Sequence, residues 1–185
     1  MNEKAIKTFL ANDSLRMQNR LVESELRNLL NALYEPLQVR ADMLYGILRK
    51  EKLGYEIRRG FFNGHYRKNE RGEYEKDFYP IPEIELLGLC DIEIGFNETC
   101  VTAKLDKARL AELGSETFSP YSFEIYGVED WLLAFGDSDS FATAVQSALE
   151  SGETEFFFSF SLDGQTDSPS LVELIKLLVQ KGFHY

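Results

Sequence analysis

Histidine and cysteine, which often act in catalysis or metal binding, are scarce in this sequence of 185 residues. The chain contains two histidines, His65 and His184, and two cysteines, Cys90 and Cys100. Either histidine could act as a base, but neither has a recognisable Ser, Cys or Asp partner in the sequence. The four residues could supply one zinc site, but their positions lack the spacing of zinc ligands. We therefore interpret both histidines as exposed polar residues and identify no catalytic residue, metal ligand or cofactor site.

Sequence motifs do not reveal a reaction either. The chain has no glycine-rich phosphate loop of the G-x-G-x-x-G or G-x-x-x-x-G-K-S/T type and no G-x-S-x-G motif. The 31 Asp and Glu residues are so many that a pair of carboxylates in a cleft would not be diagnostic. Because catalytic triads are recognised by geometry rather than by sequence order, an enzyme with an unrecognised site stays an alternative.

The net charge of −11 is unevenly distributed along the chain. Residues 1–79 contain 15 Lys+Arg and 12 Asp+Glu, a net of +3, whereas residues 80–185 contain 5 and 19, a net of −14. The acidic half should repel nucleic acid and anionic lipid, so we expect neither a nucleic-acid partner nor a membrane. This charge either keeps the protein soluble or forms a docking surface for a basic protein partner.

The candidate docking surface consists of acids and aromatics that we expect in loops, strands and helix starts of the acidic half. Tyr and Trp dominate binding energy at interfaces, while charge mainly governs the encounter rate. Such a surface would suit a non-enzymatic protein-binding module, for example an inhibitor, immunity or adaptor protein. The candidate binding residues are Glu116, Tyr121, Tyr126, Glu129, Asp130, Trp131, Asp137 and Asp139.

A second group of candidates is basic and lies in a predicted β-meander at 55–79. Asn63-Gly64 is the strongest short hairpin signal in the chain. Basic residues interleaved with aromatics can hold phosphates and stack bases, although cross-strand pairing with nearby glutamates explains the same pattern. A ligand- or nucleic-acid-binding protein is therefore an alternative. Its candidate residues are Arg58, Arg59, His65, Arg67, Lys68 and Arg71.

The elements that would position these residues are clearest at 86–105. Apolar and polar residues alternate there with period two, which is typical of a half-buried strand. A turn at Asn97-Glu98 then predicts a hairpin in which Ile92 lies opposite Ala103. In this register Cys90 and Cys100 point to opposite faces of the hairpin, so we expect two free thiols.

The N-terminal region has an amphipathic helical pattern, with apolar residues at spacings of three and four from 22 to 48. Pro36 interrupts the pattern, and proline inside a helix costs about 3 kcal/mol. We therefore expect two helices, or one bent helix, at about 15–34 and 36–54. Further along, Ser168-Pro169 and Gly182 are typical of the start and the end of a helix at 169–181.

Together these patterns predict an α+β fold with a mainly antiparallel sheet. Its strands are expected at 86–95, 99–105, 121–126 and 154–162, and 131–135 is either a further strand or a helix start. Helices at 140–151 and 169–181 are expected to cover one face of the sheet.

An N-terminal helical segment, 1–54, should pack on an α+β body, 55–185, within one compact domain. The chain lacks an N-terminal apolar signal core and an apolar run of the roughly 20 residues that a membrane span needs. We therefore expect a cytoplasmic protein, and the sequence predicts no particular oligomeric state.

Overall fold

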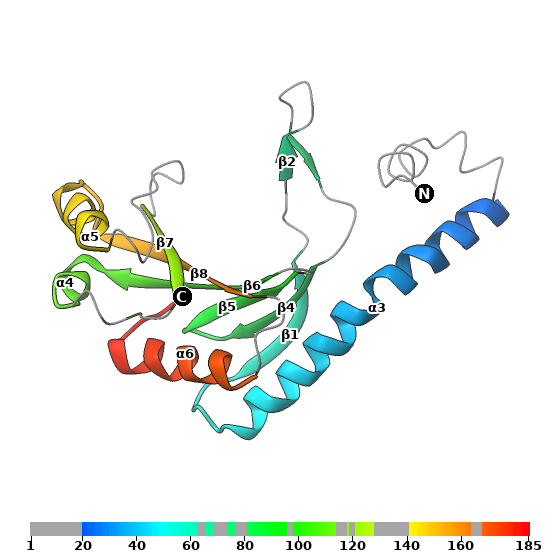
Figure 1. Cartoon of the computed structure of the whole chain (residues 1–185), viewed down its shortest axis with the longest axis horizontal. Coiled ribbons are helices and arrows are strands. Elements are labelled where there is room, and N and C mark those ends of the chain that lie inside the picture. Colours follow the sequence, from blue (N-terminus) through cyan, green and yellow to red (C-terminus); the bar gives the residue numbers. More distant parts are fainter. Residues whose placement is uncertain are drawn as a thin grey trace.

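The computed structural model describes residues 20–62, 66–68, 74–76, 81–95, 98–113, 118, 121–127, 141–163 and 168–185. Within these ranges the chain forms a six-stranded antiparallel sheet, a separate two-stranded sheet and four helices (Figure 1). The α+β class expected from the sequence is confirmed. The predicted element at 131–135 lies outside the described residues.

The large sheet has the strand order β1-β4-β5-β6-β8-β7, with every neighbouring pair antiparallel. The small sheet pairs β2 with β3 and stands away from the large one, on the side opposite α6 (Figure 1). The strands are β1 (Ile57–Phe62), β2 (Tyr66–Lys68), β3 (Tyr74–Lys76), β4 (Ile81–Leu86), β5 (Cys90–Ile94), β6 (Glu98–Asp106), β7 (Ser122–Gly127) and β8 (Glu155–Asp163).

The helices are α3 (Arg20–Lys50), α4 (Lys107–Leu110), α5 (Phe141–Glu150) and α6 (Ser168–Lys181). α3 and α6 lie along the same face of the large sheet, and α5 lies beside α4 at one end of it (Figure 1). An ion pair between Lys176 Nζ and Glu51 Oε2, 2.7 Å apart, joins α6 to the end of α3. None of the described helices is long and apolar enough to cross a bilayer.

α3 continues through Pro36 as a single helix, so the expected division into two helices was wrong. Pro36 is exposed, while the next residues on the sheet side are buried in the common core. Each buried leucine contributes about 1.5–3 kcal/mol, which together offset the cost of about 3 kcal/mol for the proline. The buried row is Leu37, Ala41, Leu44 and Leu48.

The core between the sheet and these helices is rich in phenylalanine. Along β8, which lies where the sequence predicted a strand, the residues at alternate positions from 156 to 162 face the core. Phe158 lies at the centre, and its ring is 5.1–6.0 Å from four other rings. These belong to Phe118, Phe123, Phe160 and Phe183.

The hairpin of β5 and β6 has the expected faces but another register. Ile92 lies opposite Val101 rather than Ala103. The Gly95 N–H donates to the Glu98 carbonyl at 2.9 Å, which closes the hairpin one residue earlier than a turn at Asn97-Glu98 would. The cross-strand pairs therefore shift by two residues. Because side chains alternate with period two, every residue keeps its face.

The strand expected at 86–95 is interrupted near its start. β4 ends at Leu86 and β5 begins at Cys90, directly opposite it. The Leu89 N–H donates to the Leu86 carbonyl at 2.9 Å, and Gly88 has a φ of +78° that favours glycine. The apolar alternation therefore spans a hairpin turn instead of one strand.

The β-meander expected at 55–79 was wrong for the pairing of its first strand, although all three strands are present and the second pairs with the third. β1 pairs with β4, while β2 pairs with β3 in the separate sheet. Pro82 lies within β4 opposite Phe61. It precedes Glu83, the first residue of β4 paired with β5, and proline is tolerated near a strand start.

Replacing Phe158 by alanine should lower the free energy of unfolding by roughly 3–5 kcal/mol, because the ring is fully buried among other aromatics. Chemical denaturation measures the change. Ser161→Ala, at an exposed position of the same strand, is the matched control and should change stability by less than about 0.5 kcal/mol. A loss below about 1 kcal/mol for Phe158→Ala would mean that the inner face of β8 is wrongly assigned.

Cys100 should react with a thiol reagent in the native protein much faster than Cys90. Cys90 is fully buried, and burial raises the pKa of its thiol, which suppresses the reactive thiolate. Cys100 is half-buried on the opposite face, with its Sγ 3.0 Å from Ser159 Oγ. Mass spectrometry after timed alkylation measures both rates. Equal rates, or a disulfide between the two residues, would contradict the assignment.

Candidate functional site

The face of the large sheet that points away from α3 and α6 is polar, and we call it the polar face. Along β4, β5 and β6 its residues alternate with the fully buried residues of the core face. Direct cross-strand pairing continues the same face from β4 to β8. Its residues include Glu83, Glu85, Asp91, Glu93, Cys100, Thr102, Lys104, Glu155, Phe157, Ser159 and Ser161.

Four carboxylates gather on this face, and we call them the carboxylate quartet. Glu83 of β4 lies directly opposite Glu93 of β5, and Glu85 lies directly opposite Asp91. All four side chains are half-buried. Like charges directly opposite each other destabilise a sheet, so the arrangement attracts cations. The sequence signal was available, because two strands joined by a short turn both carry acids at alternate positions.

The quartet changes the proton affinity of its members. The pKa of Glu83 is raised to about 7, first by burial and then by repulsion from Asp91, Glu93 and Glu85. Burial also raises the pKa of Asp91, while a hydrogen bond from Tyr185 lowers it. Burial and the Asp91 contact raise the pKa of the Tyr185 hydroxyl. Glu83 can therefore gain or lose a proton near neutral pH.

The C-terminal residues reach the polar face after α6 ends. Gly182, with a φ of +80°, reverses the chain, and the Phe183 N–H donates to the Leu178 carbonyl at 3.0 Å. Phe183 is buried in the core. His184 then pairs with Lys104 of β6 through two backbone hydrogen bonds of 2.6 and 3.0 Å. The chain end thus adds a short bridge to the edge of β6.

Two side chains of this tail rest against the sheet. The Tyr185 ring lies 6.2 Å from the Phe157 ring, and Lys104 Nζ lies within 5.4 Å of both ring centres. His184 Nε2 lies 2.7 Å from Glu155 Oε1 and 4.0 Å from Asp106 Oδ1. The potential ligand atoms of these last three residues all lie within 4.8 Å of one another. Asp106, Glu155 and His184 form what we call the C-terminal triad.

Two of the acidic-half candidates lie in the described residues. Tyr121 is half-buried just before β7, and its hydroxyl donates to the Ser170 carbonyl at 3.3 Å, which ties β7 to α6. Tyr126 is half-buried on β7. Within the described residues, Tyr121 and Tyr126 do not belong to a common cluster of candidate residues. The candidates outside the described residues are Glu116, Glu129, Asp130, Trp131, Asp137 and Asp139.

The basic candidates are divided between the two sides of β1 and the small sheet. Arg58 Nε forms a 2.9 Å ion pair with Glu56. Arg59 points the other way, towards α3, where it contacts Asp42 at 3.0 Å and Gln38 at 2.8 Å. Arg67 and Lys68 lie on β2, of which the structure describes the backbone, and His65 and Arg71 lie outside the described residues.

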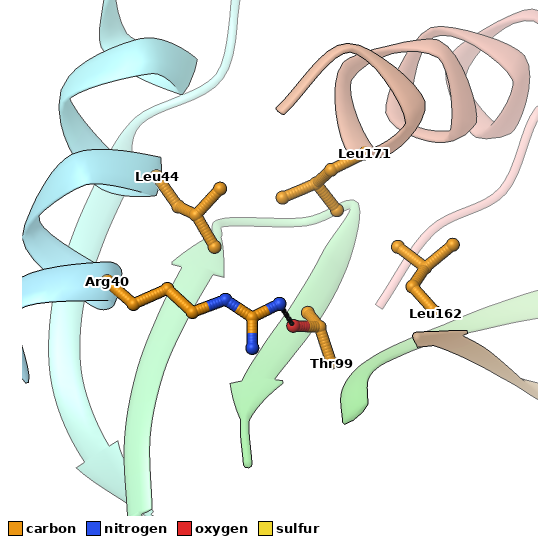
Figure 2. A pocket seen from close by; sticks show the side chains of 5 residues that line it. All are labelled: Arg40, Leu44, Thr99, Leu162 and Leu171. Atoms are coloured by element: carbon orange, nitrogen blue, oxygen red, sulfur yellow. Dashed lines mark hydrogen bonds between the residues drawn. The ribbon is translucent and has the colours of Figure 1, made fainter. Parts of the chain in front are cut away.

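A hollow between α3, α6 and the β5–β6 hairpin contains Arg40 (Figure 2). The Arg40 guanidinium donates to Thr99 Oγ1 at 2.8 Å and to the Gly95 carbonyl at 3.4 Å. Burial lowers the pKa of Arg40, while Asp163 raises it. The hollow is too narrow to admit a water molecule. Arg40 therefore holds α3 against the hairpin, and the hollow is a packing feature. Its other lining residues are Leu44, Leu162 and Leu171.

Comparison with known proteins adds a fold relationship. No model of a protein family matches the chain, and no curated protein sequence matches it. The solved structure of a conserved hypothetical protein from Pyrococcus furiosus is similar, with a TM-score of 0.57 and 17% sequence identity. The match covers 86% of this chain and 98% of that protein. At this identity the likeness supports the fold alone.

Replacing Glu83 by glutamine should remove a pH dependence of stability. Its folded-state pKa of about 7 exceeds the ordinary 4.5, so between these values the native protein binds more protons than the unfolded chain. Wild-type stability should therefore fall as pH rises through this window. At pH 8 the variant should be more stable by at most about 1 kcal/mol, because solvent screens the partly exposed carboxylate.

Urea denaturation at pH 4.5, 6 and 8 measures this difference, which should vanish at the lowest pH. Glu124→Gln, an exposed position of β7, is the matched control and should follow wild type throughout. If the free energies of unfolding of wild type and Glu83→Gln changed equally with pH, the raised pKa of Glu83 would be contradicted.

Proposed function

We propose that this protein is a non-enzymatic protein-binding module, of the inhibitor, immunity or adaptor type, that binds a basic segment of a partner protein on its polar face. The observation that carries the proposal is the pair of opposed carboxylates, Glu83 with Glu93 and Glu85 with Asp91. A lysine or arginine between them would relieve the repulsion that raises the pKa of Glu83. Such complementarity governs partner choice and association rate.

The spacing of the quartet favours an extended partner segment. Side chains on one face of a strand repeat about every 7 Å, and opposed Cβ atoms of antiparallel strands lie about 5 Å apart. An extended peptide with Lys or Arg at alternate positions presents its cations on one side with the same repeat. Consecutive cations point to opposite sides, so fewer of them would reach the carboxylates.

α3 supports the class of function independently of charge. An apolar row on its surface repeats at spacings of three and four, which is the pattern of a helix–helix seam. Within this row Leu29 is 54%, Val39 62% and Met43 52% exposed. Contiguous exposed apolar surface of this kind is typical of protein interaction sites. Among the α3 residues whose exposure the structure describes, the row is Leu29, Ala32, Pro36, Val39 and Met43.

An enzyme is the alternative that the pKa of Glu83 favours, since a carboxyl that titrates near neutral pH suits a general acid or base. The two functions make different demands on the quartet. A docking face uses all four charges, whereas acid–base chemistry depends on Glu83. The nucleic-acid alternative is weakened at Arg59, which contacts α3 instead of facing outward.

The proposal predicts binding of a short peptide with alternating lysine and serine, measured by calorimetry at low ionic strength. Glu83→Gln with Glu93→Gln should weaken binding about five- to thirtyfold, because the two lost ion pairs contribute about 0.5–1 kcal/mol each. The matched control, Glu150→Gln with Glu173→Gln, removes the same charge at exposed positions on α5 and α6, away from the polar face, and should bind within twofold of wild type.

A peptide of the same composition with its lysines in one block tests the extended geometry and should bind more weakly. Duplex DNA should not bind. Equal loss of peptide affinity in both double variants would reduce the effect to net charge and contradict a specific face. Failure of wild type to bind either peptide would also contradict the proposal.

A further inference from the structure

We propose that the C-terminal triad binds one divalent transition-metal ion, such as Zn²⁺, through His184 Nε2 and the carboxylates of Asp106 and Glu155. One nitrogen and two carboxylate oxygens form a donor set that suits such ions. The three residues come from the chain end, the end of β6 and the start of β8. A bound ion would therefore fix the C-terminal tail to two strands of the sheet.

The two distances from His184 Nε2 to the carboxylates bracket those of a metal site. Two ligands bound at about 2.1 Å with a tetrahedral angle lie about 3.4 Å apart. His184 Nε2 is 2.7 Å from Glu155 Oε1 and 4.0 Å from Asp106 Oδ1. One separation must open and the other must close by less than 1 Å, which small side-chain rotations can supply. The backbone of His184 is already held by its two hydrogen bonds to Lys104.

The side chain of Asp106 gives a second, independent indication. Asp106 occupies the N-cap position of α4, where an aspartate ordinarily accepts a hydrogen bond from the helix backbone. Here its side chain makes no such cap bond, although the backbone is extended as a cap requires. The carboxylate lies near His184 instead, and it is 63% exposed and so open to an ion from solvent. A metal role explains an acid in the capping position that does not cap.

Lys104 is the group that opposes metal binding. Its Nζ lies 4.0 Å from Glu155 Oε2 and stacks over the Phe157 and Tyr185 rings. A metal ion at the triad would compete with this ammonium for Glu155. A neutral side chain of similar length would keep the ring contacts and remove the competing charge. Lys104→Met should therefore tighten metal binding, which a purely structural ion pair does not predict.

The test is titration of the full chain with Zn²⁺ by calorimetry, together with the visible absorption of Co²⁺. Wild type should bind one equivalent and show a higher melting temperature with Zn²⁺. Asp106→Asn and His184→Ala should each weaken binding at least tenfold. Asp106→Asn loses no cap hydrogen bond, so its fold should survive and keep the test interpretable. Lys104→Met should bind more tightly than wild type, and Lys176→Met should match wild type.

Other potential ligands must be excluded in the same experiment. His65→Ala and Cys100→Ser should leave the affinity unchanged, since they remove the other histidine and the more accessible thiol. Wild type that binds no Zn²⁺ would overturn the proposal. So would binding that survives both Asp106→Asn and His184→Ala, or Co²⁺ spectra with the charge-transfer band of a thiolate ligand.

Discussion

The register between β4 and β5 is the constraint on which the polar face depends. The pairing that buries the isoleucines and leucines of both strands places Glu83 opposite Glu93 and Glu85 opposite Asp91. Each buried aliphatic side chain contributes about 1.5–3 kcal/mol. A cross-strand like-charge pair costs roughly 0.2–1 kcal/mol. The apolar pattern therefore decides which face the carboxylates take, and the turn closed by the Leu89 N–H and the Leu86 carbonyl sets their pairing. A one-residue slip would expose the core residues, so the fold keeps the carboxylates together, and protons or bound cations can relieve their repulsion.

The same argument explains which parts of the fold were predictable. Burial repeats every two residues along a strand and every three to four along a helix, so the faces of β5, β6, β7 and β8 and the limits of α5 and α6 follow from local pattern. A period of two cannot separate one register from another shifted by two, which is why Ile92 was paired with Ala103 instead of Val101. Local pattern also does not determine which strands pair with each other. β1 leaves the expected meander to pair with β4, and Pro36 stays inside α3 because buried neighbours outweigh its local cost.

The candidate sites were harder to predict because their residues meet only through tertiary structure. The sequence offered so many acids that no pair stood out, and the quartet becomes recognisable once β4 and β5 are known to pair. His184 was interpreted as an exposed polar residue because it has no partner nearby in the sequence. Its partners, Asp106 and Glu155, come from two other strands. The pairing of β5 with β6 ends at Asp91, which lies opposite Thr102. The backbone of Lys104, two residues further along β6, is therefore available to the chain end. Residue propensities do not indicate where the backbone of a strand lacks a neighbouring strand.

Tyr185 connects the quartet and the triad. Its side chain hydrogen-bonds Asp91, and its backbone follows His184 directly. A metal ion held by His184 would restrict the tail and so favour this hydrogen bond. The bond lowers the pKa of Asp91, against the burial that raises it, and thereby keeps a negative charge on the polar face. A metal ion at the triad would in this way favour a basic segment at the quartet. Because binding free energies are linked, the segment would favour the metal by the same factor. One hydrogen bond to a charged group contributes about 1.5–3 kcal/mol, which sets the upper limit of that coupling.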